Sequence, residues 1–328
     1  MKAAAFKTMG PADEVLEIME LDQPTPTHGE VLVRLNCSAV NPSDVKKRNG
    51  AFPELLKDGF IIPHSDGAGI IEEVGRGVPS SRIGERVWVY EAQYGRRFGT
   101  AAEYVTVDSN RAVWLPDNVD FEVGACMGIP AMTAHRCVFA DGLVDGQTLL
   151  VTGGAGRVGH YAIQWAKYAG ATVIATASNP AAEAHCYAAG ADAVCSHQGE
   201  DLLSTVADLT DGNGVERIVD GEFGGNLPVL LDVAATSATI ATYASMQVAE
   251  PTLPFRRMLF QDLTIRMVLV YAMPETAKND AIEDITDLLD GKMLQHRIAY
   301  RESLENIASA HQKIEQAGFY GVVLVDID

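Results

Sequence analysis

The residues that most clearly could do chemistry lie in a glycine-rich stretch between Leu149 and Pro180, LLVTGGAGRVGHYAIQWAKYAGATVIATASNP. Its glycines have the spacing G-x-G-x-x-G, after a short apolar run and before a helical pattern. In such a turn one glycine permits a tight reversal, one lets the backbone approach a diphosphate, and one packs the helix against the strand. An ordinary strand–helix turn is the alternative, but a further strand pattern, Ala171–Ala177, completes the context of a dinucleotide site. The predicted loop residues are Gly154, Ala155, Gly156, Arg157, Val158 and Gly159.

The end of that further strand indicates which dinucleotide is bound. NAD sites place an acidic residue there, about 20 residues after the loop, to bind the ribose 2′-hydroxyl. The segment Ala171–Ala182 contains no Asp or Glu, so a 2′-phosphate would meet no repulsion. Ser178 and Asn179 can donate hydrogen bonds to it, and Arg157 can add positive charge, unless that arginine is only a solvated residue at the helix start. We therefore expect NADPH as the cofactor.

The elements around the loop suggest two kinds of domain in a chain of 328 residues. The first third alternates apolar and polar residues in short strands such as EVLVRLNCSAV, which suggests a small barrel or sandwich. After about Phe121, apolar runs alternate with helical segments, which predicts βαβ units and a parallel sheet. The tail carries two amphipathic helices, roughly Thr276–Leu289 and Ser303–Ala317, and a last strand, GVVLVDID.

Composition excludes several classes of partner and environment. The net charge of −19 argues against nucleic acid or an anionic membrane surface. The five cysteines are scattered and never spaced C-x-x-C, which favours reduced thiols over disulfides or a zinc ribbon. The chain start lacks a signal-peptide pattern, and the longest apolar runs are too short to span a bilayer. We expect a cytoplasmic protein.

Four motifs together resemble the medium-chain dehydrogenase/reductase superfamily. They are VNPSDVKKRNGAF, IIPHSDGAGIIEEVG, GIPAMTAHR and the glycine loop, in the order and spacing of that family. Within it, the chain is similar to the zinc-free quinone oxidoreductases of the zeta-crystallin-like branch. The resemblance implies an α/β fold, in which a GroES-like β-barrel catalytic domain (1–121 and 263–328) encloses a doubly wound Rossmann NADP-binding domain (122–262). The substrate would bind in the cleft between them, and a homodimer would form through the apolar edge-strand candidate Thr264–Tyr271.

The zinc ligands of the metal-dependent relatives are missing at the matching positions. These positions hold Pro42 or Ser43, Ser65 with Asp66, and Ile129, and no cysteine lies between Cys37 and Cys126 to supply the structural zinc lobe. His64 is next to the missing site, but a lone histidine is more often structural. We expect no metal.

The resemblance also implies roles for residues outside the loop. Asn41 and Asp44 would lie near the nicotinamide and the substrate, although NPSD also fits an Asx-Pro turn that reverses the chain. Thr133 and Tyr243 would contact the cofactor, as would His197 after the third strand. Phe52 replaces a tyrosine common in relatives, so water or a ribose hydroxyl would protonate the product. Val322 follows Gly321 where many relatives have lysine, which weakens the phosphate site and predicts a modest preference for NADPH over NADH.

The segment Tyr90–Gly99 would form a loop over the cleft. Gln93 and Tyr94 are candidates for contact with the substrate, whereas Arg96 and Arg97 are expected to be solvated.

The resulting hypothesis is an NADPH-dependent quinone reductase. Quinones suit a site without metal because they accept hydride readily and yield an aromatic product. The alternatives are a reductase of enoyl or other activated double bonds, acting on a small conjugated carbonyl compound, and a non-catalytic NADPH-binding protein.

Overall fold

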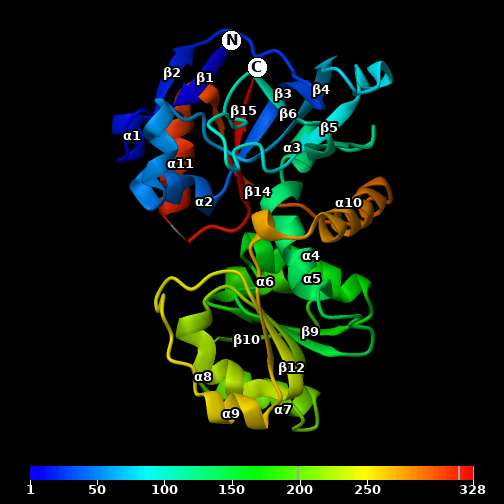
Figure 1. Cartoon of the computed structure of the whole chain (residues 1–328). Helices are drawn as coiled ribbons and strands as arrows, with labels where there is room; N and C mark the ends of the chain where they lie inside the picture. Colours follow the sequence, from blue (N-terminus) through cyan, green and yellow to red (C-terminus); the bar gives the residue numbers. More distant parts are fainter. Residues whose placement is uncertain (198, 317, 328) are drawn as a thin grey trace. The chain divides into compact units, whose positions relative to one another are not determined.

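The computed structural model describes residues 1–197, 199–316 and 318–327. Contacts divide the chain into two compact units, which we name the β unit (Met1–Ile129 and Ile282–Asp328) and the α/β unit (Pro130–Ala281). The chain therefore leaves one unit, builds the second, and returns to complete the first (Figure 1). Among the described residues, no helix is long and apolar enough to cross a membrane.

The α/β unit contains a six-stranded parallel sheet in the order β10-β9-β8-β11-β12-β13. This is the strand order 3-2-1-4-5-6 of a doubly wound dinucleotide-binding fold. The strands are β8 (Thr148–Val151), β9 (Thr172–Ala177), β10 (Ala193–Ser196), β11 (Val215–Asp220), β12 (Ala234–Thr242) and β13 (Thr264–Met267).

The helices of this unit follow from the strand order. From β8 the chain continues to β9 and β10 on one side of the sheet, and from β11 it continues to β12 and β13 on the other side. Because each crossover is right-handed, the helices of these two halves lie on opposite faces of the sheet. Accordingly α5 contacts both α4 and α6, and α7 contacts α8. The helices are α4 (Met132–Phe139), α5 (Arg157–Tyr168), α6 (Pro180–Ala188), α7 (Glu200–Leu209), α8 (Phe223–Val233) and α9 (Phe255–Phe260). The sixteen-residue α10 (Glu275–Asp290) includes the point at which the chain passes from one unit to the other.

The β unit has a seven-stranded mixed sheet in the order β14-β15-β3-β4-β5-β7, with β6 also paired to β3. β1 and β2 form a separate antiparallel pair. The strands are β1 (Lys2–Ala5), β2 (Glu17–Glu20), β3 (Glu30–Val40), β4 (Asp66–Val74), β5 (Arg86–Val89), β6 (Tyr104–Asp108), β7 (Ala112–Trp114), β14 (Ile298–Ser303) and β15 (Val322–Asp326). Short helices α1 (Ala12–Val15), α2 (Pro42–Lys46), α3 (Phe121–Gly124) and α11 (Ile307–Glu315) complete it.

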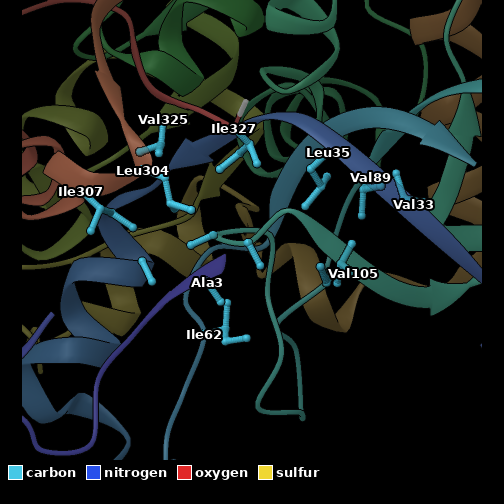
Figure 2. Packing of buried hydrophobic residues seen from close by; sticks show 14 of the residues in the cluster. Ala3, Val33, Leu35, Ile62, Val89, Val105, Leu304, Ile307, Val325 and Ile327 are labelled. Atoms are coloured by element: carbon cyan, nitrogen blue, oxygen red, sulfur yellow. The ribbon is translucent and has the colours of Figure 1, made fainter. Parts of the chain in front are cut away.

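One apolar core joins the two ends of the chain in the β unit. Figure 2 shows Ala3 from the first strand near Ile62, with Leu35 and Val105 from the central strands. Leu304, Ile307, Val325 and Ile327 from the last elements belong to the same buried cluster. The C-terminal segment is therefore part of the folding unit, because its apolar side chains complete this core.

Several expected boundaries differ from those observed. The parallel sheet continues past residue 262, because β13 pairs with β12, and the units divide at 129/130 and 281/282. The expected strand Thr264–Tyr271 ends at Met267, since residues 270–272 form a 3-10 turn. The last helix starts at Ile307 after a 3-10 turn, and its expected end, Ala317, lies outside the described residues.

Candidate cofactor and substrate sites

The glycine loop joins the carboxyl end of β8 to the start of α5, at the switch point of the sheet. Gly153 and Gly156 are exposed, and Gly156 is the N-cap of α5, with the Gly156 N–H donating to Gly153 O at 2.8 Å. Arg157 and Val158 are half-buried in the first turn of the helix. The first N–H groups of a helix have no partner within it, so this turn presents donors and partial positive charge outward.

The other two glycines of the motif pack the helix against the sheet. A Cβ on Gly154 would lie 2.9 Å from side-chain atoms of Ala175, Cys186 and Ile163. A Cβ on Gly159 would lie 2.6 Å from the backbone oxygen of Gly153. By contrast, a Cβ on Gly156 would approach only that same oxygen, at 3.1 Å. Of the three motif glycines, Gly156 therefore has the most open space around it, and a ligand could approach its backbone there.

Further polar groups lie at the adjacent strand ends. The Thr176 hydroxyl accepts a hydrogen bond from Gly153 N at 2.9 Å, which ties β9 to the loop. Ser178 and Asn179 are exposed just after β9, and His197 is exposed just after β10. Asn179 also caps α6, because its Oδ1 accepts from Ala182 N at 3.0 Å, while its Nδ2 donates to Ser178 Oγ at 3.3 Å. Since β8, β9 and β10 are neighbours, all these residues share one edge of the sheet.

A buried carboxyl group, Asp220, forms hydrogen bonds between the ends of β8 and β11, at the switch point of the sheet. Asp220 Oδ2 accepts from Thr152 Oγ1 at 2.6 Å and from Asn226 Nδ2 at 2.8 Å, and Oδ1 accepts from Glu222 N at 2.9 Å. Burial raises the pKa of Asp220, despite these donors. This network holds the loop side of β8 against β11.

The remaining cofactor candidates occupy other parts of the α/β unit. Tyr243 follows β12 and lines a cavity of about 490 Å³, with Phe223, Leu253, Met267 and Leu269. Burial raises the pKa of the Tyr243 phenol, so it is neutral at physiological pH. Thr133 is buried on α4. The cavity is at the carboxyl ends of β12 and β13, the edge at which doubly wound sheets bind ligands.

These residues fit a dinucleotide. The loop offers exposed glycine backbone and a helix N-terminus, and the end of β9 offers hydroxyl and amide donors without an acid.

In the β unit, Asn41 and Asp44 form a buried cap at the start of α2. Asn41 N donates to Asp44 Oδ2 at 2.8 Å, and the two residues are 2% and 0% exposed. The motif NPSD therefore forms a capping box at the start of α2, which is a structural role for both residues. It does not remove the candidate role near the substrate, which stays a prediction.

The same cap contacts a fully buried carboxyl group, Asp66. Asp66 Oδ2 accepts from Asn41 Nδ2 and from Ile129 N, both at 2.8 Å. Oδ1 has no hydrogen-bond partner among the described residues, and a Cβ on Gly128 would lie 2.1 Å from it. Burial, aided by the nearby Asp44 carboxylate, raises the pKa of Asp66 to about 8. Asp66 is therefore mostly a neutral acid at pH 7.

His64 has structural partners, as expected for a lone histidine. Its Nε2 is 2.9 Å from His311 Nε2, and its Nδ1 is 2.8 Å from Ser38 Oγ. Burial lowers the pKa of His64 to about 3, so the ring is neutral and joins two distant parts of the chain. Among the described residues, no group of three or more His, Cys, Asp or Glu side chains could hold a metal ion.

The predicted loop Tyr90–Gly99 has an exposed tip and a fixed base. Tyr94 is 51% exposed, and Phe52, on a separate segment, is 48% exposed. Gln93 is buried, so the structure does not support its direct contact with a substrate. The expectation that Arg96 and Arg97 are merely solvated is wrong, because they donate to backbone oxygens of Thr106 and Asp58.

Comparisons with known proteins agree with this architecture. A family model described as an alcohol dehydrogenase GroES-like domain matches residues 27–117, and one described as a zinc-binding dehydrogenase matches residues 158–287. The chain belongs to the medium-chain dehydrogenase/reductase superfamily. Its fold is accordingly a GroES-like domain with a Rossmann domain, as the motifs predicted.

Relatives within the superfamily have several named activities. The chain is 31% identical to rat quinone oxidoreductase over 66% of this chain and 64% of that protein, and 27% identical to the human one over 94% and 92%. It is also 28% identical to a trans-enoyl reductase of Aspergillus terreus, over 72% of this chain and 84% of that protein. A solved mycobacterial protein in complex with NADPH has a TM-score of 0.86 at 27% identity, covering 99% of this chain and 100% of that one. This dehydrogenase/reductase is thus an oxidoreductase with quinone oxidoreductases among its relatives.

Sequence reasoning missed Asp66 and Lys47 as parts of the site's framework. Both stood in quoted motifs, but only their burial beside Asn41 and Gln93 gives them significance. The signals available were a lysine three residues after NPSD and an acid in the motif IIPHSDGAG.

Proposed function

We propose that this protein is an NADPH-dependent, zinc-independent quinone reductase. The observation that carries the proposal is the glycine loop with open backbone at Gly156 and no acid at the end of β9. The NADPH complex of the mycobacterial neighbour and the quinone oxidoreductase names of the relatives support it.

In this proposal the loop and the strand ends hold the cofactor. N–H groups of the first helical turn, from Arg157 to Gly159, would bind the diphosphate. Ser178, Asn179, Arg157 and His197 would surround the 2′-phosphate. NADPH, when bound, supplies a hydride to the acceptor. Thr133 and Tyr243 would contact its other half. After hydride transfer the acceptor would take one proton, from solvent or a ribose hydroxyl, because Phe52 has no hydroxyl.

The absence of zinc in the proposal rests on residue chemistry. Ser43, Ser65 and Ile129 stand at the ligand positions and provide no thiolate or imidazole. The one carboxyl group there, Asp66, directs Oδ2 at two N–H donors. An acceptor that needs no Lewis acid, such as a quinone, matches such a site.

The proposed oligomer is a homodimer through the β13 edge. Met267 and Leu269 are 67% and 58% exposed there, and Phe255 and Phe260 on α9 are also exposed. An apolar exposed edge strand favours pairing with another chain.

The alternative reaction is reduction of an activated double bond, which the Aspergillus trans-enoyl reductase supports. A steady-state panel would compare 1,4-benzoquinone and 9,10-phenanthrenequinone with a 2-alkenal, each with NADPH and NADH. We expect quinone turnover with a modest NADPH preference in kcat/KM. Turnover of the alkenal alone would favour the alternative, and tight NADPH binding without turnover would indicate a non-catalytic binding protein.

The cofactor preference has a matched variant. Arg157→Ala should lower the NADPH/NADH ratio about tenfold if that arginine contacts the phosphate. An unchanged ratio would leave the phosphate to Ser178, Asn179 and His197.

A further inference from the structure

A buried lysine, Lys47, joins two segments of the β unit. The residue is 8% exposed, although lysine is seldom buried. Its Nζ donates to Gln93 Oε1 at 2.6 Å and to Gln93 O at 3.3 Å, and it is 3.9 Å from Asp44 Oδ1. The ammonium is therefore held between the loop Tyr90–Gly99 and the cap of α2.

Both segments that Lys47 joins carry residues of the proposed acceptor site. On one side, Asp44 accepts from Asn41 N at 2.8 Å, and Asn41 in turn donates to Asp66. On the other side, Gln93 is 1% exposed and precedes Tyr94. A continuous set of polar contacts thus links Asp66, Asn41 and the base of the Tyr94 loop.

The loop is anchored on both sides of its tip. Before the tip, the Glu91 carboxylate forms an ion pair with Arg111 at 3.3 Å. The backbone of Glu91 has a left-handed conformation, with φ of 57°. After it, Gln93 Nε2 donates to Arg96 O at 2.8 Å, and Arg96 donates to Thr106 O at 2.7 Å. Within this set, Lys47 connects the base of the loop to α2 and its cap.

Burial of an ammonium has a large desolvation cost, and an apolar pair of the same size often stabilises a fold equally well. Burial also lowers the pKa of Lys47, which reflects the same cost. Packing alone therefore does not account for a lysine here, whereas a fixed distance between two parts of a site does.

We propose that Lys47 is a positioning residue, which holds the Gln93 loop against the α2 cap and so sets where Tyr94 meets the acceptor. The inference rests on the proposed function for its acceptor, but the tether itself is a property of the β unit. It predicts selectivity among acceptors, because residues far apart in sequence contact the acceptor from the two joined segments.

The test uses Lys47→Met, which keeps the length of the side chain and removes its donors. The matched control is Lys46→Met, on the exposed neighbour in α2. Hydrogen exchange of backbone amides in residues 92–98 should become about tenfold faster in Lys47→Met, the loss expected for one charge-assisted hydrogen bond. Amides of the α/β unit and the Kd for NADPH should not change.

A kinetic measurement on the same variants tests the effect on the acceptor. In Lys47→Met we expect KM for the quinone to rise about tenfold with a smaller change in kcat, and the ranking of two quinones of different size to change. Lys46→Met should match the wild type.

A second pair of variants separates positioning from stability. Gln93→Met should reproduce the faster exchange and the higher KM. The double variant Lys47→Met with Gln93→Met should fold, because two methionines can pack against each other, but it should regain neither the slow exchange nor the low KM of the wild type. Unchanged exchange in a folded single or double variant, or equal effects of Lys46→Met, would overturn the proposal. If the wild type turns over no acceptor, the proposed function fails. The exchange measurement would still show whether Lys47 holds the Gln93 loop against α2.

Discussion

Replacement of Asp66 by asparagine tests the central electrostatic feature of the β unit. The side chain is fully buried, its Oδ2 accepts two N–H donors, and its Oδ1 faces Gly128. The amide oxygen of an asparagine can accept from the same two donors, so Asp66→Asn removes the titration while keeping most of the geometry.

The size of the effect follows from linkage. The pKa of Asp66 is about 8 in the folded chain and 3.8 for the ordinary group, so between these values the folded state holds a proton that the unfolded state has lost. The stabilisation is complete below the lower value and is lost as the pH rises through the upper one. From pH 6 to pH 8, the free energy of unfolding should fall by about 2 kcal/mol through this group.

The assay is chemical denaturation at pH 6, 7 and 8, with hydrogen exchange on peptides of the β unit to give its unfolding free energy separately. Asp66→Asn should show a pH slope shallower than that of the wild type by the amount above, whereas the control Asp280→Asn, on an exposed residue of α10, should keep the wild-type slope. His64 adds stability as the pH rises through its ordinary pKa of 6.5, because burial lowers its folded pKa to about 3. This contribution is the same in the wild type and in Asp66→Asn, so it cancels in the difference between their slopes. A wild-type slope in Asp66→Asn would refute the reasoning, since it would mean that Asp66 is ionised in the folded protein.

Three more outcomes are expected. Gly154→Ala should lower the Tm of the apoprotein, because its Cβ would lie 2.9 Å from three side chains, whereas Gly156→Val should leave a folded protein that shows no NADPH-induced thermal shift. Near-normal NADPH affinity of Gly156→Val in isothermal titration would contradict the loop assignment. Incubation with EDTA should leave quinone reduction unchanged, and a loss restored by zinc would show a metal that the residues do not suggest. Light scattering at micromolar concentration should give the mass of a dimer, and Met267→Lys should shift it toward the monomer by placing a charge on the β13 edge; a monomeric wild type would count against the proposed interface.

Local patterns in the sequence were sufficient to predict the fold class and the strand–loop–helix unit that carries the glycine motif. The glycine spacing, the lack of an acid after β9 and the alternation of strands and helices each lie within a short stretch of chain, and each reflects a steric or packing requirement of that stretch. Gly154 and Gly159 show this directly, since their hydrogens occupy space that no Cβ could enter.

The buried polar framework could be found only in the tertiary structure. Asp66 gains its raised pKa from burial and from Asp44, and His64 pairs with His311, 247 residues away. Likewise, Lys47 in a helical motif and Gln93 in a loop are both polar residues that sequence patterns assign to the surface. Burial and long-range pairing depend on how distant segments fold together. The sequence by itself therefore determined the glycine loop and the fold class, whereas the tertiary contacts decided which charged side chains are buried together in the β unit.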